Sequence, residues 1–251
     1  MDNILKHFKT IMEHKYWVGK YCFLAGLYWR GIKHDMSKFH PIEFRESIKY
    51  YTGKRSPIDV CKEMNGVSQA WLHHKGRNDH HYLYWQDNFD QNNGRVIPTH
   101  SHMPYKPLLE SICDSLGAAR TYLGEEFSYY KEYKWYCEFV KNSAMNDLDK
   151  RIVLFIVFKL AYIETKYGIC EPEKVKKVLR RTFNEVYTTG IQNIIGCKTN
   201  WNKCYNFYKS YNFYREMHNC INGNLLGGGL MLIDVDIMYY DEILRNTKRR
   251  E

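Results

Sequence analysis

Residues 34–41 read His34-Asp35-Met36-Ser37-Lys38-Phe39-His40-Pro41. A histidine and an aspartate are adjacent in this stretch, and neighbouring side chains at a helix end can both reach one metal ion. The carboxylate of Asp35 has two oxygens, so it can also bridge to a second ion. Pro41 suits the first turn of a new helix, where a missing N–H costs nothing. The stretch therefore predicts a ligand-bearing junction between two helices.

Apolar residues on both sides of this junction recur at three- and four-residue steps, the spacing of one helix face. Residues 3–32 are expected to form two helices or one bent helix, because Gly19 and Gly26 weaken the pattern. Residues 87–104 contain two prolines and an Asn-Asn-Gly sequence and are expected to be a long surface loop. No run of alternating residues predicts strands, so the chain is expected to be all-α. The other expected helices cover residues 42–51, 67–74, 80–85, 108–123, 129–145, 148–167, 172–189 and 201–219. A final apolar segment follows over residues 230–244.

Composition limits the kind of protein this can be. The 251 residues are 44% apolar, carry a net charge of +9 and include eight scattered cysteines without a CxxC pair. With no apolar signal segment at the start, this pattern predicts free thiols in the cytoplasm, or in the host cytoplasm if the protein is viral. The longest apolar run, 152–158, is too short to span a bilayer, so no membrane partner is expected. The positive charge favours anionic partners such as nucleotides or nucleic acid.

Histidine is concentrated in the first part of the chain, where ten of the eleven lie at or before residue 102. His14 precedes His34 by a helix and a turn, so an antiparallel neighbour can bring it back to the junction. Asp114 lies in a predicted helix beside an apolar stripe, where a carboxylate is costly to bury unless it is paired or metal-bound. These residues are therefore predicted to meet at one site.

Two adjacent histidine pairs, His73-His74 and His80-His81, can add ligands. Neighbours on a helix diverge by about 100°, so one histidine of each pair is expected to point away. His74 and His81 are the preferred ligands, although His73 and His80 have the same seven-residue spacing. Seven residues of helix rise about 10.5 Å, so the turn predicted at 76–79 must fold the segment back for both to reach the site.

The order of His14, residues 34–38 and Asp114 resembles the H…HD…D pattern of the HD-domain phosphohydrolase superfamily. Residues 71–74 resemble the HH element of its two-metal members. Residues 112–120 resemble its last motif, an aspartate followed by a small-residue helix and an arginine. The resemblance implies an HD-like helical bundle that binds metal.

A small uncharacterised phage and bacterial family is a closer match. Its motifs HD-x-SKF-x-P-x-EF, AW-x-HH…N-x-HH-x-x-YW and MPY…ICD are similar to residues 34–44, 70–85 and 103–114. This implies an HD-like domain over residues 1–128 that holds one or two divalent ions, namely Mn, Fe, Ni, Co or Zn, with Mg possible. The resemblance covers about residues 7–125, and residues 131–251 match neither family. Residues 129–251 are expected to form a helical extension packed on the first domain.

The predicted function is metal-dependent hydrolysis of a phosphomonoester or phosphodiester, in a phosphorylated small molecule such as a nucleotide or in nucleic acid. Metal ions activate water and clamp the phosphoryl oxygens. Asp35, Lys38 and Arg120 are the predicted catalytic residues, with Lys38 and Arg120 also contacting phosphate. Asn78 is expected to bind substrate or only to make the turn. The predicted metal ligands are His14, His34, Asp35, His74, His81 and Asp114.

Two other functions stay open. HD-fold proteins that hold two irons and activate oxygen have similar ligand sets, so a di-iron oxygenase is one alternative. The other is a non-catalytic module whose metal is structural and whose second half binds nucleic acid or a host protein. The run 201–214 has the aromatic and basic composition of such a surface, although a packed helix is favoured. His100 and His102 are expected to be solvated loop residues or to flank the site.

Overall fold

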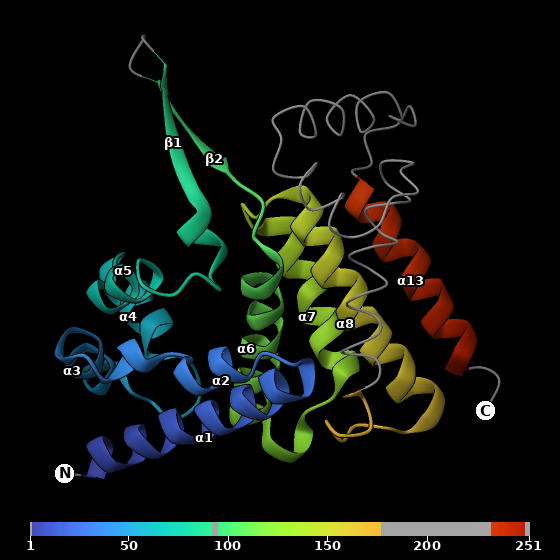
Figure 1. The fold of residues 1–251 in the computed structure, drawn as a ribbon, viewed down its shortest axis with the longest axis horizontal. Helices are drawn as coiled ribbons and strands as arrows, with labels where there is room; N and C mark the ends of the chain where they lie inside the picture. The colour runs from blue at the N-terminus through green and yellow to red at the C-terminus, as the bar shows by residue number, and fades with distance from the viewer. Residues whose placement is uncertain (1, 92–94, 177–231, 249–251) are drawn as a thin grey trace. The chain divides into compact units, whose positions relative to one another are not determined.

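The computed structural model describes residues 2–91, 95–176 and 232–248. These residues form helices joined by turns and one two-stranded hairpin (Figure 1), so the all-α prediction is confirmed for the described part of the chain. The chain divides into two compact units. The first comprises residues 1–127 with 144–149, and the second comprises 128–143 with 150–251. The predicted packing of the second half on the first stays a prediction.

The first unit begins with two helices rather than one bent helix. α1 (Asp2–Ala25) ends at Gly26, whose φ of +85° suits a residue without a side chain. α2 (Tyr28–Lys33) then runs back beside α1 (Figure 1). The two helices lie so close that a Cβ atom on Gly31 would come within 2.8 Å of Cys22 Cβ. This reversal returns the chain after α2 to the middle of α1, where the His34 and His14 rings are 5.5 Å apart.

Three short helices continue the first unit, and the first of them packs on the other two. Pro41 and Pro57 each occupy the first turn of a helix, where proline is tolerated. Ser68 caps the third helix by accepting a hydrogen bond of 3.0 Å from the Trp71 N–H. The middle helix was not predicted from the sequence. The three are α3 (Pro41–Tyr50), α4 (Pro57–Asn65) and α5 (Gln69–Lys75).

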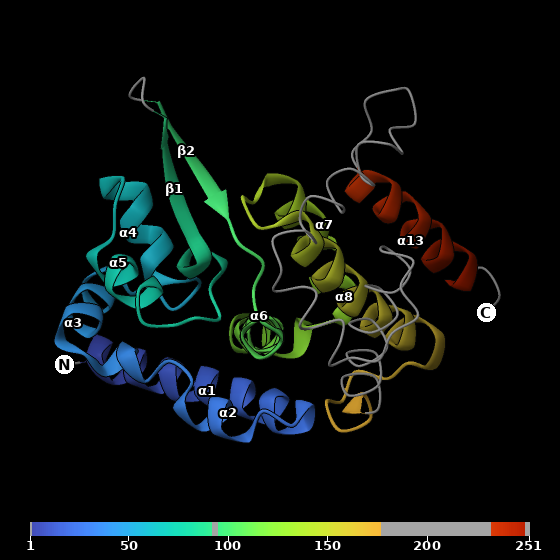
Figure 2. The ribbon, with the colours of Figure 1, turned by 45° about the horizontal axis from the view of Figure 1, so that its top comes forward.

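The helix α6 (Tyr105–Leu123) carries Asp114 and crosses α1 steeply, as Figure 2 shows with α6 viewed nearly along its axis. Buried leucines and Ile112 line its contact face. At Gly117 the backbones are so close that a Cβ atom would overlap Val18 Cγ2 and lie 2.9 Å from the Val18 nitrogen. The absence of a side chain at Gly117 therefore allows α6 to bring Asp114 against α1.

Gly117→Ala should destabilise the protein by about 3 kcal/mol, because the added methyl group must push the α1 backbone away. An ordinary Gly→Ala change inside a helix stabilises by about 1 kcal/mol, so the expected sign is reversed here. Gly76→Ala is the matched control, since its Cβ would come no closer than 3.4 Å to its surroundings. Denaturant unfolding would measure both variants, and equal stability of Gly117→Ala and the parent would contradict the close crossing.

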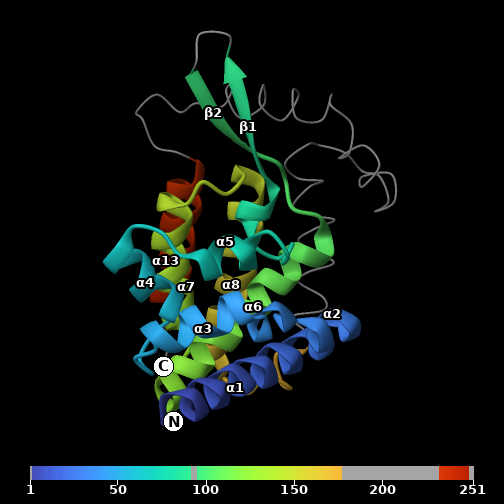
Figure 3. The same ribbon diagram turned by 90° about the vertical axis from the view of Figure 1, so that its left-hand side faces the viewer.

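Residues 86–91 and 95–100 form two paired β-strands, so the prediction of a surface loop over 87–104 is wrong for most of the described part of that segment. β1 (Gln86–Gln91) pairs antiparallel with β2 (Arg95–His100), with Gln86 opposite His100. The ribbon projects away from the helices of the first unit (Figures 1 and 3). Polar residues dominate the strands, so they lack the alternation that predicts a strand. The Asn93-Gly94 dipeptide between them was the available hairpin signal.

The described part of the second unit contains α7 (Tyr129–Asn142), most of α8 (Asp147–Tyr167) and α13 (Leu232–Lys248). The Tyr133 hydroxyl donates a 3.0 Å hydrogen bond to Asp241, and the Phe158 ring stacks on Tyr240 at 4.3 Å. α7 and α8 confirm the helices predicted for 129–145 and 148–167, and α13 lies over the final apolar segment, for which no helix was predicted. Within the predicted helix 172–189, residues 172–175 form turns and residues from 177 onward lie outside the described residues. The predicted helix 201–219, with the basic run 201–214, lies wholly outside them.

The composition also predicted free thiols and no membrane-spanning segment. Among the described residues no cysteine forms a disulfide bond, and four cysteines are buried: Cys22, Cys61, Cys113 and Cys137. In the same part of the chain, no helix has the length and apolar character needed to cross a membrane.

Candidate metal centre

Asp35 lies at the centre of a buried group of histidines. It joins α2 to the 3₁₀ turn η1 (Met36–Phe39) and has a left-handed backbone with φ 54° and ψ 27°. A non-glycine residue held in this region costs about 1–3 kcal/mol, and such residues cluster at functional sites. Its side chain is only 1% exposed. The chain therefore maintains an unfavourable backbone conformation in order to present a buried carboxylate.

One oxygen of Asp35 faces the first ligand group, which consists of His14, His34, Asp35 and Asp114. Asp35 Oδ2 is 3.5 Å from His14 Nε2 and 3.3 Å from His34 Nε2. Asp114 Oδ1 is 3.1 Å from the Nε2 atoms of both histidines. Three elements that are far apart in the sequence thus bring their donor atoms together around one point.

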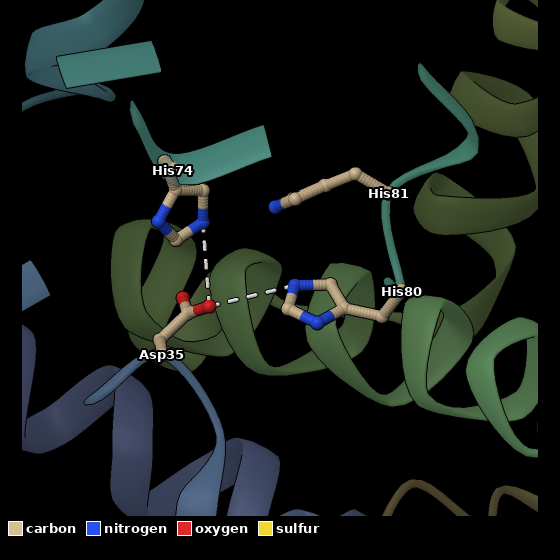
Figure 4. A group of neighbouring side chains, drawn as sticks. All are labelled: Asp35, His74, His80 and His81. Atoms are coloured by element: carbon tan, nitrogen blue, oxygen red, sulfur yellow. Dashed lines mark ion pairs between the residues drawn. The ribbon is translucent and has the colours of Figure 1, made fainter. Parts of the chain in front are cut away.

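The other oxygen of Asp35 faces the second ligand group, which consists of Asp35, His74, His80 and His81. Asp35 Oδ1 is 3.3 Å from His74 Nε2 and 3.4 Å from His80 Nε2. Figure 4 shows these two rings directed at the carboxylate, with a nitrogen of His81 pointing toward the same space. The His81 ring centroid lies 4.8 Å from that of His74 and 4.2 Å from that of His80.

The donor atoms of these groups fit metal ions. His14 Nε2, Asp35 Oδ1, His80 Nε2 and His81 Nε2 are buried and make no hydrogen bond within the described residues. Leaving each such atom unsatisfied costs about 1–3 kcal/mol. The ligand atoms of each group lie within 4.8 Å of one another. Imidazole and carboxylate donors together suit divalent transition metals, so the residues present fit one ion in each group.

Two buried glutamates orient the histidines, and the sequence analysis missed both. His34 Nδ1 is 2.8 Å from Glu110 Oε1, and His74 Nδ1 is 2.8 Å from Glu43 Oε2. A carboxylate on Nδ1 holds the N–H there and leaves Nε2 free to bind metal. Glu110 also approaches His80 Nδ1 at 3.4 Å and accepts a hydrogen bond from Arg30. The signal was available, because Glu110 precedes Asp114 by four residues and so shares its helix face.

The two histidine pairs behave differently. His73 points away from the site, with its Nδ1 2.5 Å from Glu43 Oε1 and its ring stacked on His40 at 4.2 Å. The expectation that one member of each pair points away is therefore right for this pair. It is wrong for His80 and His81, which both face the second ligand group. His80 and His81 follow the turn after α5 and do not lie in a helix. The angle of about 100° between neighbouring side chains of a helix therefore does not apply to them. This turn also brings His74 and His81 together, as expected.

A known protein family, described as a family of unknown function (DUF5662), matches residues 3–158. This range includes all the residues of both ligand groups. The chain belongs to this family. No curated protein and no solved structure matches the chain. The DUF5662 match extends through the first unit and ends inside α8. The implied membership of the HD-domain superfamily stays an expectation.

The residues predicted to contact substrate have different positions. Lys38 Nζ is 2.6 Å from Asp35 Oδ2, beside the first ligand group. Asn78 donates hydrogen bonds to the His74 carbonyl at 2.7 Å and to Ser37 Oγ at 2.8 Å, so it positions the second ligand group. The structure does not bring Arg120 to the site. Its guanidinium bonds the Tyr21 hydroxyl and lies 3.9 Å from the centre of a phenylalanine ring. Arg120 follows Asp114 by six residues and therefore points to another face of α6.

Of the two loop histidines, which were expected to be solvated or to flank the site, His102 is buried and His100 is partly exposed. His102 is buried against the carboxylate of Asp149, which accepts a 2.8 Å hydrogen bond from the Met103 N–H. The His100 carbonyl accepts a hydrogen bond from Asn146 at 3.2 Å. Both histidines thus join the hairpin to the 144–149 segment of the first unit.

A cavity of about 180 Å³ adjoins the ligand groups. Its lining includes Asp35 and Asp114 with His14, His74 and His81, and the ammonium of Lys38. Residues of both ligand groups therefore form part of the wall of one cavity.

Protons balance the buried charge when metal is absent. Burial lowers the pKa of His34, but Asp35, Asp114 and Glu110 together raise it to well above the ordinary value. For His74 the same opposition leaves the pKa at about 9. Burial raises the pKa of Asp35 and of Asp114, but the histidines hold both carboxyl groups well below their usual range. Metal binding must therefore displace protons from the histidines.

The stability of the metal-free protein should decrease with rising pH. His74 has a pKa raised from 6.5 to about 9, so its contribution is fully present below pH 6.5 and is lost as the pH rises through about 9. The expected loss in unfolding free energy is about 3 kcal/mol. Denaturant unfolding of the chelator-treated protein between pH 6 and pH 10 would measure it. The metal-loaded protein is the control and should lack this loss, and a flat metal-free profile would contradict the protonated state of His74.

Proposed function

We propose that this chain is a metal-dependent phosphohydrolase that acts on a phosphomonoester or phosphodiester, in a nucleotide or nucleic acid. One observation carries the proposal: the two oxygens of the buried Asp35 carboxylate each face their own set of donor atoms. One carboxylate placed in this way can bridge two ions. Paired ions suit phosphoester hydrolysis because they stabilise both the attacking and the leaving oxygen. The resemblance to the HD-domain superfamily supports the same reaction.

The two ligand groups define which residues would hold the ions. His14, His34 and Asp114 would bind one ion, and the three histidines of the second group would bind the other. Asp35 would contribute to both. When bound, divalent ions supply an activated water and polarise the phosphoryl group. The nitrogen-rich donor set favours Mn, Fe, Co, Ni or Zn over Mg, which prefers oxygen ligands.

Lys38 is the charged side chain that a phosphate would meet, and His81 is a neutral candidate ligand. Burial lowers the pKa of Lys38, but Asp35 and then Asp114 raise it above the ordinary value, so the ammonium stays charged. Its side chain is 26% exposed and lines the cavity, where it can neutralise a phosphoryl oxygen. Burial and the neighbouring His80 hold the pKa of His81 well below the usual range, so this ring is neutral and able to bind metal.

Metal analysis followed by a phosphoester panel tests the proposal. We expect about two ions per chain, and phosphate release that stops with a chelator and returns with the metal. Lys38→Met should keep the metal content and reduce turnover about 100-fold. Lys49→Met, on an exposed position of α3, is the matched control. Oxygen uptake by iron-loaded protein without phosphoester hydrolysis would favour the oxygenase. Metal binding without turnover, together with salt-dependent nucleic-acid binding, would favour the non-catalytic module.

A further inference from the structure

His7 is a buried histidine that belongs to neither ligand group. It is 5% exposed, and neither ring nitrogen has a hydrogen-bond partner among the described residues. Its ring packs against Phe44 and Tyr51, with centroid distances of 5.6 Å and 5.1 Å. A buried polar group without a partner costs about 1–3 kcal/mol. The fold thus leaves two buried hydrogen-bonding atoms without a partner among the described residues.

The His7 side chain lines the same cavity as the ligand groups. His7 precedes His14 on α1 by seven residues, which places it on the same helix face about 10.5 Å away. The hydroxyl-bearing side chains that line the cavity are Thr10, Ser47, Ser56 and Tyr122. The cavity therefore joins a metal-binding end to a part that offers uncharged hydrogen-bonding groups.

Charge and size restrict what this cavity can hold. Lys38, beside Asp35, is the one Lys or Arg among the described residues that line it. A single phosphoryl group would be neutralised by Lys38 and the proposed metal ions at that end, whereas the further phosphates of a di- or triphosphate would meet no Lys or Arg in the rest of the lining. At about 180 Å³ the cavity is also smaller than the roughly 300–1,000 Å³ of common ligand sites. Both features favour a small monophosphate.

We propose that His7 is a substrate-binding residue, and that the cavity takes a small phosphomonoester whose alcohol portion places a hydroxyl group against the His7 ring. The placement of the phosphoryl group at the metal-binding end of the cavity rests on the proposed function. Burial, followed by the charge of Lys38, lowers the pKa of His7 to about 4. The ring is therefore neutral near pH 7 and offers one donor and one acceptor, the pair that a hydroxyl group needs.

Calorimetry on the metal-loaded full chain tests the role of His7, with inorganic phosphate and ribose 5-phosphate as probes. His7→Phe keeps an apolar ring and removes both nitrogens, so it should weaken ribose 5-phosphate binding about tenfold and leave phosphate binding unchanged. His7→Gln keeps a donor and an acceptor and should retain most of the affinity. His40→Phe, at an exposed position outside the cavity lining, is the control and should change neither affinity.

A comparison in the parent protein covers the case in which His7→Phe does not fold. The parent should bind ribose 5-phosphate about tenfold more tightly than n-pentyl phosphate, which lacks the hydroxyl groups. Equal affinities for these two compounds, or an unchanged affinity in a folded His7→Phe variant, would overturn the assignment. Phosphate release from ribose 5-phosphate is measured separately. Selective binding without release counts against hydrolysis but supports the role of His7, whereas hydrolysis without selectivity supports the reaction and counts against the role of His7.

Discussion

Asp35→Asn is expected to remove both metal ions and to reduce phosphoester hydrolysis by about 10³-fold or more. Loss of an outer partner of a metal ligand already costs about 10–100-fold, and Asp35 is placed to be a direct ligand in both groups. Asparagine keeps the shape of the side chain, but it replaces one oxygen with an NH₂ group and removes the negative charge. One of the two ions would then face a donor hydrogen instead of a lone pair.

Elemental analysis and phosphate release measure this outcome, and circular dichroism checks that the helices persist. Asp59→Asn, at an exposed position of α4, is the matched control and should bind metal like the parent. Retention of two ions by Asp35→Asn would refute the bridging assignment. Retention of one ion would mean that Asp35 is a ligand in only one of the two groups.

His14→Ala and His80→Ala should each reduce the metal content from about two ions to about one. His14 belongs only to the first ligand group, whereas His80 faces Asp35 Oδ1 in the second. Because each change leaves the other group intact, the double variant should bind no ion. Each single variant should lose about 10²-fold or more in turnover, since clamping both oxygens of the phosphoryl transfer requires both ions.

His73→Ala is the control for these variants, because His73 adjoins the site but points away from it. It should keep both ions. If His80 served the substrate instead of the metal, His80→Ala would keep two ions and lose only turnover. Should both single variants lose all metal, the two groups would be one cooperative site rather than two separable ones.

Local sequence patterns were sufficient to predict the helices and most of the candidate ligands. Helix periodicity is a local property, so α6, α7 and α8 were predicted close to their observed bounds. The adjacent His34-Asp35 pair, together with His14 in the helix before it and Asp114 in a later helix, was enough to predict one shared site. The residues His14, His34, Asp35, His74, His81 and Asp114 do converge in the structure.

The side chains that complete the site became evident only from the packing of the helices. Glu43 in α3 faces His74 in α5, and Glu110 in α6 faces His34, because the helices pack together. Sequence alone did not indicate this, since glutamate in a helix is usually exposed. His80 faces the site because a turn redirects the chain, and side-chain direction after a turn follows no fixed period. Arg120 was misplaced because sequence order does not show which helix face meets a cavity. Local residue spacing determines where helices form and which residues share a helix face. Which helix faces pack together depends on contacts between residues that are distant in the chain.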